Sequence, residues 1–186
     1  SSHFVLGAFG VALIGMGGIA ILTSGHTASH HGISDRRWLN LVLTYVSYPL
    51  FFDVPATYWW RKHVVLHHPA PNVIGHDEDW DFLPFFATSR VQLEASGGLW
   101  RVYYRVQWLL VPLMLASGGF NVQFIGWRHL LRGLRHGRGW NRLVAFDLLS
   151  LAMHWVVFLG LPLLWFPLTA VLVFYVVRNV AIGVAL

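Results

Sequence analysis

Long apolar runs separated by short polar segments dominate the chain. The first run, residues 4–22, carries no charge and is rich in glycine. Three further apolar runs cover residues 106–127, 143–161 and 163–186. About twenty apolar residues are enough for a helix to cross a hydrocarbon core of roughly 30 Å. The pattern therefore predicts an all-α fold, an integral membrane bundle of helices.

Two shorter segments lie between the first run and the later ones. Residues 38–52 are apolar but number only about fifteen, which is short for a membrane span, so we expect them to lie in or dip into the interface. Residues 58–68 predict a helix that ends before Pro69, because proline does not continue a helix. An acidic, turn-rich loop is expected to follow over residues 69–84.

Composition supports a membrane protein and narrows its chemistry. Hydrophobic residues make up 56% of the chain and charged residues 11%, far below the usual quarter. There is no cysteine, so a transition-metal site has to use imidazole and carboxylate ligands. The net charge of +5 comes from arginines between apolar runs, clustered once over residues 128–142. This is typical of a basic membrane flank, which can dock anionic headgroups or an acidic electron donor, rather than of a nucleic-acid-binding protein.

Six of the eleven histidines fall in two short clusters with matching helical spacing. Residues four apart share one face of a helix, so two imidazoles of each cluster can converge on one metal ion. The adjacent third histidine is expected to point about 100° away, where it can serve a second ion. Six nitrogen ligands exceed the needs of one zinc ion and favour iron or another imidazole-tolerant metal. The candidate metal ligands are His26, His30, His31, His63, His67 and His68.

The stretches HTASHH and WWRKHVVLHHPAPNVIGHDEDWDFLP resemble the first and second histidine boxes of the membrane fatty acid desaturases. The likeness is strongest to the acyl-lipid and front-end branch. A tryptophan pair, spaced histidines ending in His-His, an asparagine, a glycine and an Asp-x-Asp run follow one another in that order. Here the residues after the histidines are Asn72, Gly75, Asp77 and Asp79. The stretch YYRVQWLLVPLMLA is also similar to this branch.

Three features depart from that pattern. The second box reads His-x-x-x-His-His, one residue longer than usual, as in related hydroxylases, and Thr27 replaces an acidic residue common in the first box. A third His-His cluster is absent, and the sequence stops within an apolar run. We therefore expect residues 1–186 to form a single, partial desaturase domain, with the third box following Leu186.

The resemblance implies an O2-dependent fatty acyl desaturase with two iron ions held by the box histidines. Its substrate would be an acyl-lipid, acyl-CoA or acyl-carrier chain, and its electrons would come from ferredoxin or cytochrome b5. A hydroxylase or ketolase with the same centre is the nearby alternative, and a metal transporter a more distant one. The transporter is disfavoured because the clustered histidines crowd one end of the helices.

Residues after the second box are candidates to support the metal ligands. Asp77, Asp79 and Asp81 can accept hydrogen bonds from ligand N–H groups, or can form a solvated acidic loop. Asn72 can orient the turn after the box. The histidine boxes are expected on the cytoplasmic side of a bacterial inner membrane or of the endoplasmic reticulum. To bring a third box to the same side, residues 106–127 are expected not to cross, because Pro112 and the pair Gly118 and Gly119 interrupt them.

Overall fold

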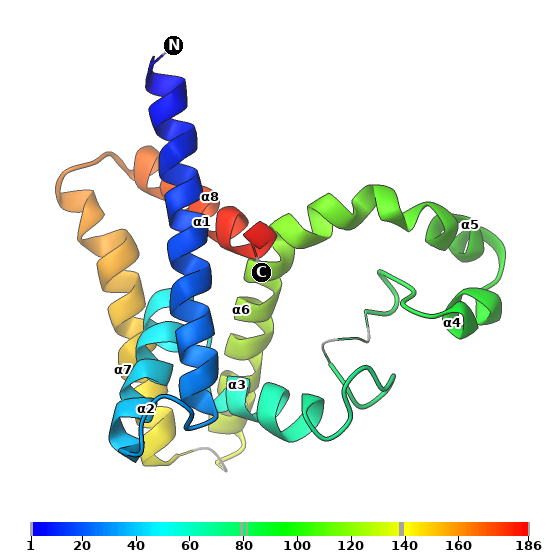
Figure 1. Ribbon diagram of the computed structural model, residues 1–186, viewed down its shortest axis with the longest axis horizontal. Coiled ribbons are helices and arrows are strands. Elements are labelled where there is room, and N and C mark those ends of the chain that lie inside the picture. Colours follow the sequence, from blue (N-terminus) through cyan, green and yellow to red (C-terminus); the bar gives the residue numbers. More distant parts are fainter. Residues whose placement is uncertain (1, 79, 81, 138–139, 186) are drawn as a thin grey trace. The chain divides into compact units, whose positions relative to one another are not determined.

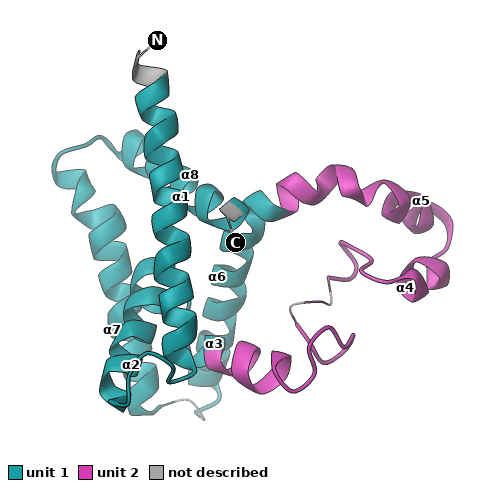
Figure 2. Ribbon diagram, viewed as in Figure 1, with its two compact units in different colours: residues 1–59, 115–186 teal, residues 60–114 magenta. Residues whose placement is uncertain are grey.

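The computed structural model describes residues 2–78, 80, 82–137 and 140–185 (Figure 1). Every regular element within these ranges is a helix, which confirms the predicted all-α class. The chain divides into two compact units (Figure 2). Unit 1 contains residues 1–59 and 115–186, and unit 2 contains residues 60–114.

The helices follow the apolar runs of the sequence. The α-helices are α1 (Ser2–Ser29), α2 (Arg37–Tyr45), α3 (Ala56–Trp59), α4 (Arg90–Ala95), α5 (Gly98–Val106), α6 (Val111–Arg135), α7 (Arg142–Trp155) and α8 (Leu168–Ala185). The π-helical segments are η1 (Val46–Phe51), η2 (Trp60–His67) and η4 (Val156–Gly160), and the 3-10 segments are η3 (Gln107–Leu110) and η5 (Pro162–Leu164). The predicted helix over residues 58–68 is therefore found, as α3 continued directly by η2.

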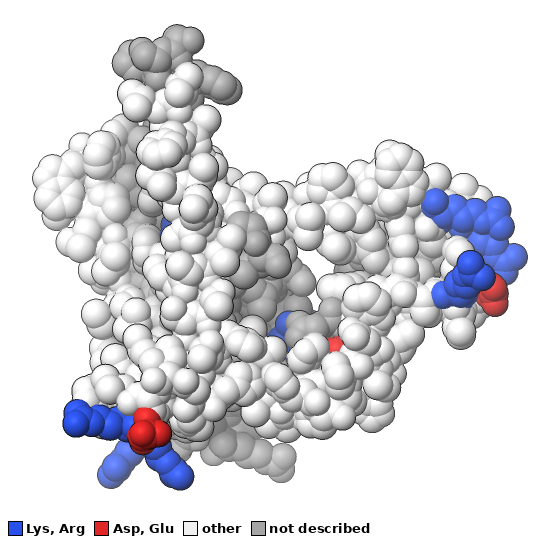
Figure 3. Space-filling view, in the orientation of Figure 1, with Lys and Arg blue, Asp and Glu red and all other residues white. Residues whose placement is uncertain are grey.

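Three helical runs in the described part of the chain are long and apolar enough to cross a membrane. They are Val5–Ser29, Gly98–Arg135 and Arg142–Leu164, and Leu168–Val184 is a shorter apolar helix. Figure 3 shows the flanks of α1 and α7 almost free of charged atoms; within unit 1 the charged atoms in this view gather where α1 ends, and unit 2 carries its own group over α4 and α5. Bare apolar flanks of this kind suit a lipid environment.

The expected interruption of residues 106–127 is found at one of its two places. α5 ends at Val106 and the 3-10 segment η3 (Gln107–Leu110) directly precedes the turn with Pro112, but the glycine pair does not interrupt the helix. α6 continues through Gly118 and Gly119 without a break. Pro112 lies in the first turn of α6, where a missing N–H removes no helical hydrogen bond. Whether this segment crosses the bilayer stays a prediction, because its length and composition permit a span.

Close helix packing holds unit 1 together. The segment α2–η1 lies between α1 and α7 (Figure 1) and places Tyr48 and Phe52 in a buried apolar cluster with Leu22. A Cβ atom on Gly25 would lie 2.3 Å from Cβ of Ser47, so only glycine lets α1 and η1 approach this closely. Small residues at crossings are the usual means of close approach between membrane helices.

Backbone hydrogen bonding is interrupted where η1 ends, and polar side chains from three helices complete it. The carbonyls of Leu50, Phe51 and Phe52 would otherwise be unsatisfied inside the bundle. They accept hydrogen bonds from His154 Nδ1 (2.9 Å), from the guanidinium of Arg178 and from Gln123 Nε2 (2.8 Å), respectively. Each donor is at most 6% exposed. We call this set the carbonyl clamp.

The chain between the end of η1 and the start of α3 forms a junction, and a carboxylate from α7 binds the α3 end of it. Asp147, which is fully buried, accepts hydrogen bonds from the backbone N–H groups of Ala56 (2.7 Å) and Thr57 (3.2 Å) and from the Thr57 hydroxyl. These N–H groups belong to the first turn of α3, which has no intrahelical acceptors for them. Asp147 therefore fixes where α3 begins and which direction it takes.

Asp53 lies between the end of η1 and the start of α3. Its backbone adopts φ 59°, which turns the chain sharply between η1 and α3, and its side chain is 2% exposed. Burial raises the pKa of its carboxyl to about 7, against opposing effects of Trp127, Arg178 and Trp155. The junction is thus a buried polar turn surrounded by apolar helices.

Unit 2 carries the loop and the short helices α4 and α5. The Gln107 side chain accepts a hydrogen bond from the Ala87 N–H (2.9 Å) and donates one to the Ala87 carbonyl (2.7 Å). The hydroxyls of Tyr103 and Tyr104 donate to the carbonyls of Phe85 and Pro84, both at 2.8 Å. These bonds attach the loop to the start of the long helical run.

We predict that Asp147→Ala lowers the free energy of unfolding by on the order of 2–3 kcal/mol, because three donors lose their buried acceptor. Thermal unfolding in detergent measures this change. Asn141→Ala is the matched control, since Asn141 accepts a single bond from the Val144 N–H at the start of α7, and should cost about 1 kcal/mol. Equal losses in the two variants would contradict the proposed role of Asp147.

Candidate metal centre

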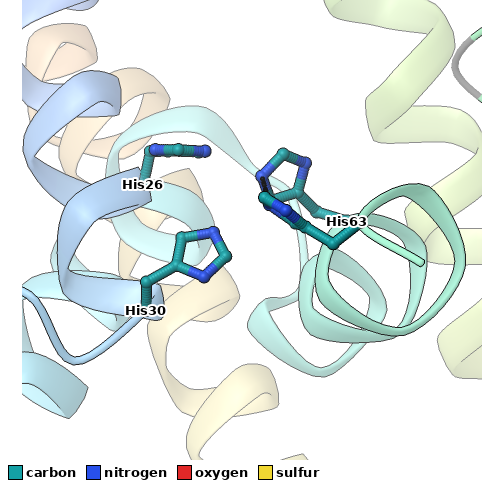
Figure 4. Close-up of side chains that lie close together, drawn as sticks. His26, His30 and His63 are labelled. Atoms are coloured by element: carbon teal, nitrogen blue, oxygen red, sulfur yellow. Dashed lines mark hydrogen bonds between the residues drawn. The ribbon is translucent and has the colours of Figure 1, made fainter. Parts of the chain in front are cut away.

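The first histidine cluster lies at the end of α1. His26 and His30 are one turn apart, and their ring centroids are 4.9 Å apart. Figure 4 shows both rings on one side of α1, and each offers a ligand nitrogen within 4.8 Å of the other. The predicted pairing at four-residue spacing is therefore present.

His31 departs from the expected arrangement. It follows the last residues of α1 with φ 58°, and its N–H donates to the Ala28 carbonyl (2.9 Å) in the closing turn. The residue is exposed. His31 therefore follows α1 in a left-handed turn and does not occupy the α-helical position that its spacing predicted.

Trp59, the last residue of α3, contacts the first cluster. Its indole N–H donates to the Ser29 hydroxyl (3.4 Å), and its ring lies 6.4 Å from that of His26. Tyr48 stacks on its other side at 4.2 Å. The Ser29 hydroxyl in turn donates to the His26 carbonyl (2.7 Å). The end of α3 is therefore fixed beside His26 within unit 1.

The second cluster lies on the π-helical segment η2, where Figure 4 labels His63. The His68 N–H donates to the His63 carbonyl (3.1 Å), a bond across five residues. This wider turn brings residue i+5 over residue i. His68 therefore lies beside His63, whereas the α-helical spacing predicted that it would point about 100° away from the other two histidines. The rings of His63, His67 and His68 lie within 5.5 Å of one another by centroid.

The spacing of two ring nitrogens in this cluster suits a metal ion. Nε2 of His63 and Nε2 of His68 are 3.1 Å apart. Two imidazoles bound at about 2.1 Å and at a right angle would place their nitrogens about 3 Å apart. His63 is 8% exposed, so a bound ion would be partly shielded from water on this side.

Asp77 supports the second cluster. Its side chain is 1% exposed, and Oδ2 lies 3.0 Å from His67 Nδ1. An ionised carboxylate only accepts hydrogen bonds, so Nδ1 carries the proton and Nε2 keeps its lone pair for a metal. The same Oδ2 accepts a hydrogen bond from the Asn72 N–H (2.7 Å).

Other predicted supporting residues have different outcomes. Asn72 contributes its backbone N–H and adopts φ 62°, so it acts as a turn residue. Asp79 and Asp81 lie outside the described residues. Glu78, which follows Asp77, forms an exposed ion pair with Arg61 at 3.4 Å.

Asp147 and the residues of the carbonyl clamp belong to none of the motifs identified in the sequence. Asp147 is the single acidic residue in the apolar run 143–161, and Arg178 the single charged residue in 163–186. An ionisable residue within a membrane-length apolar segment is costly, and it generally marks a function or a specific partner. That signal was available, although the partners of these residues were not.

Comparison with known proteins gives matches to desaturases. The sequence profile described as fatty acid desaturase matches residues 2–186. The Delta 8-(E)-sphingolipid desaturase of Candida albicans is 29% identical over 151 residues, covering 72% of this chain and 25% of that protein. That of Lachancea kluyveri is 33% identical over 119 residues, covering 54% of this chain and 20% of that protein.

The Delta(8)-fatty-acid desaturase of Euglena gracilis is 29% identical over 173 residues, covering 90% of this chain and 40% of that protein. The chain therefore spans between 20% and 40% of the length of these three relatives. No solved structure matches the sequence.

We predict that Asp77→Asn weakens metal binding by roughly 10–100-fold, because His67 loses the acceptor that fixes its tautomer and orientation. Competition with a coloured chelator measures the affinity of the purified protein. Glu78→Gln is the matched control: it removes the neighbouring carboxylate but only an exposed ion pair. If the two variants bind metal equally well, Asp77 does not orient a ligand.

Proposed function

The chain belongs to the fatty acid desaturase family, and we propose that it is part of a membrane enzyme that introduces a double bond into an acyl chain of a lipid. The observation that carries the proposal is the histidine arrangement. Two clusters with metal-ligand spacing adjoin membrane-length helices in a chain whose family is that of desaturases. The names of the relatives support a lipid substrate.

We propose that both clusters hold one centre of two iron ions. The donor set fits such ions, since it consists of imidazoles and the chain has no cysteine. Chain continuity supports a shared centre, because Trp59 contacts His26 and His63 follows Trp59 by only four residues. The proposed ligands are His26, His30, His31, His63, His67 and His68.

Six imidazoles are too few for two ions of five or six coordination each. We therefore propose that further ligands come from a third histidine group that follows residue 186. The resemblance to the family supports this proposal.

The proposed reaction removes one hydrogen from each of two adjacent carbons. With two external electrons and two protons, these hydrogens reduce O2 to two molecules of water. Bound iron would supply the oxidising power that an unactivated methylene requires. Ferredoxin or cytochrome b5 is the proposed external donor of the electrons.

The residues of this chain have defined tasks in that scheme. Asp77 holds the proton on His67 Nδ1 and leaves Nε2 to bind metal. Asp147 and the carbonyl clamp fix the start of the helix that leads to the second cluster. The apolar surroundings would accept an acyl chain and exclude water from it.

A lipid hydroxylase is the second candidate. The three-residue spacer between His63 and His67 favours it, because related hydroxylases share this spacing. In that reaction the substrate gains one oxygen instead of losing two hydrogens. The mass of the product separates the two reactions.

We further propose that the histidine clusters face the cytoplasm. The arginines of residues 128–142 support this orientation, because cytoplasmic flanks of membrane proteins are enriched in Lys and Arg. Tyr58 lies 5.5 Å from His129 by ring centroid and precedes Trp59, which contacts His26. The arginine-rich end of α6 is therefore at the same end of unit 1 as the first cluster.

The test uses the full-length gene expressed in a host with a known lipid composition. We predict that His67→Ala lowers bound iron and abolishes the unsaturated product, because the ions lose a ligand. His76→Ala is the matched control, since His76 is exposed and lies on the loop beyond the cluster. It should retain iron and product.

Lipid profiles by mass spectrometry and iron content by atomic absorption give the two readouts. Normal activity of His67→Ala would refute the metal-ligand assignment. A product that gains oxygen would replace desaturation by hydroxylation while leaving the metal centre in place.

A further inference from the structure

A groove of about 640 Å³ lies beside the C-terminal half of α6, and none of the histidines of the two clusters lines it. Its apolar lining consists of Phe124, Trp127 and Leu131 from α6 and Trp155 from α7. Phe124 is 66% exposed and Leu131 50%, so these side chains remain available for contact. The volume is in the range of sites that bind small ligands.

Three arginines form the polar part of the lining. Arg128, Arg132 and Arg135 follow one another at four and three residues along α6, so they share one face of the helix. All three are exposed, and within the described residues no carboxylate pairs with them. Arginines near the C-terminus of a helix are stabilised by the helix dipole. That effect can explain one or two arginines here, but it does not explain the apolar side chains beside them.

The aromatic and basic residues of the groove lie toward different ends of α6. Phe124 and Arg135 are eleven residues apart, which is about 16 Å along the helix. The aromatic end of the groove lies toward the middle of α6, and the arginines lie toward the end at which α1 also finishes. If unit 1 spans a bilayer, the arginines lie at headgroup depth and the aromatic rings at the depth of the acyl chains.

We propose that this groove binds an anionic phospholipid from the bilayer, with its phosphate on the three arginines and an acyl chain along the aromatic floor. Basic pockets beside membrane helices are suited to acidic headgroups. An acidic protein partner fits less well, because the four apolar side chains would then face a polar surface. The proposal is independent of the reaction at the histidines.

The test compares lipid retention by two variants of the whole protein with equal charge. The groove variant is Arg128→Gln/Arg132→Gln/Arg135→Gln, and the control is Arg36→Gln/Arg37→Gln/Arg105→Gln, whose arginines lie outside the groove. Each is purified from nanodiscs that contain phosphatidylglycerol and phosphatidylcholine, and bound lipid is counted by native mass spectrometry.

We expect wild type and control to retain phosphatidylglycerol in preference to phosphatidylcholine. The groove variant should bind phosphatidylglycerol about a hundredfold more weakly, since each arginine near an acidic headgroup contributes roughly fivefold. Inorganic phosphate should not displace the lipid, because it lacks the acyl chain. In phosphatidylglycerol brominated on its acyl chains, wild type should lose more tryptophan fluorescence than Trp155→Phe.

Equal retention by the groove variant and the control would overturn the proposal, because the effect would then be one of overall charge. Displacement by inorganic phosphate would show a simple anion site instead. If the groove variant kept its lipid but lost binding to an acidic electron donor such as cytochrome b5, the arginines would form a protein-docking surface. Unchanged thermal unfolding would establish that the exposed substitutions leave the fold intact.

Discussion

The requirement that buried backbone groups form hydrogen bonds governs this structure. The chain leaves η1 and starts α3 inside a bundle whose outer flanks are apolar, and a sharp turn at Asp53 separates the two. Unpaired N–H and C=O groups cost several kcal/mol in such surroundings. The carbonyl clamp and Asp147 remove that cost, which explains why polar side chains occur in otherwise apolar helices.

The same junction prepares the candidate metal centre. A carboxylate on α7 sets the first turn of α3, and Trp59 ends that helix beside His26. The chain then continues without interruption into η2, whose wide turn gathers three histidines. Rigid placement of ligands by a supporting set of hydrogen bonds is a general requirement of metal sites. The hydrogen bonds of this junction therefore position the helix that carries the candidate ligands, although the junction residues are not ligands themselves.

The polar residues of unit 1 fall into two classes. Several in its interior form hydrogen bonds with backbone carbonyls or with each other; the Gln123 amide, for example, donates to the Phe52 carbonyl and to Asn179 Oδ1. Those at its ends are exposed and mostly basic, and the arginines on α6 adjoin an apolar groove. This division is expected of a protein that meets hydrocarbon along its flanks and headgroups at its ends.

The helical class, the membrane-length runs and the histidine pairs could be predicted from the sequence, because the hydrophobicity of a run and the four-residue spacing within a helix are local properties. The sequence also indicated a metal site without thiolates. Three features could not be predicted in this way: the His68 ring lies against that of His63, Asp77 lies against His67, and α6 continues through Gly118 and Gly119. The clamp joins residues 71 to 127 positions apart, and such partners depend on how distant helices pack, which no local pattern encodes.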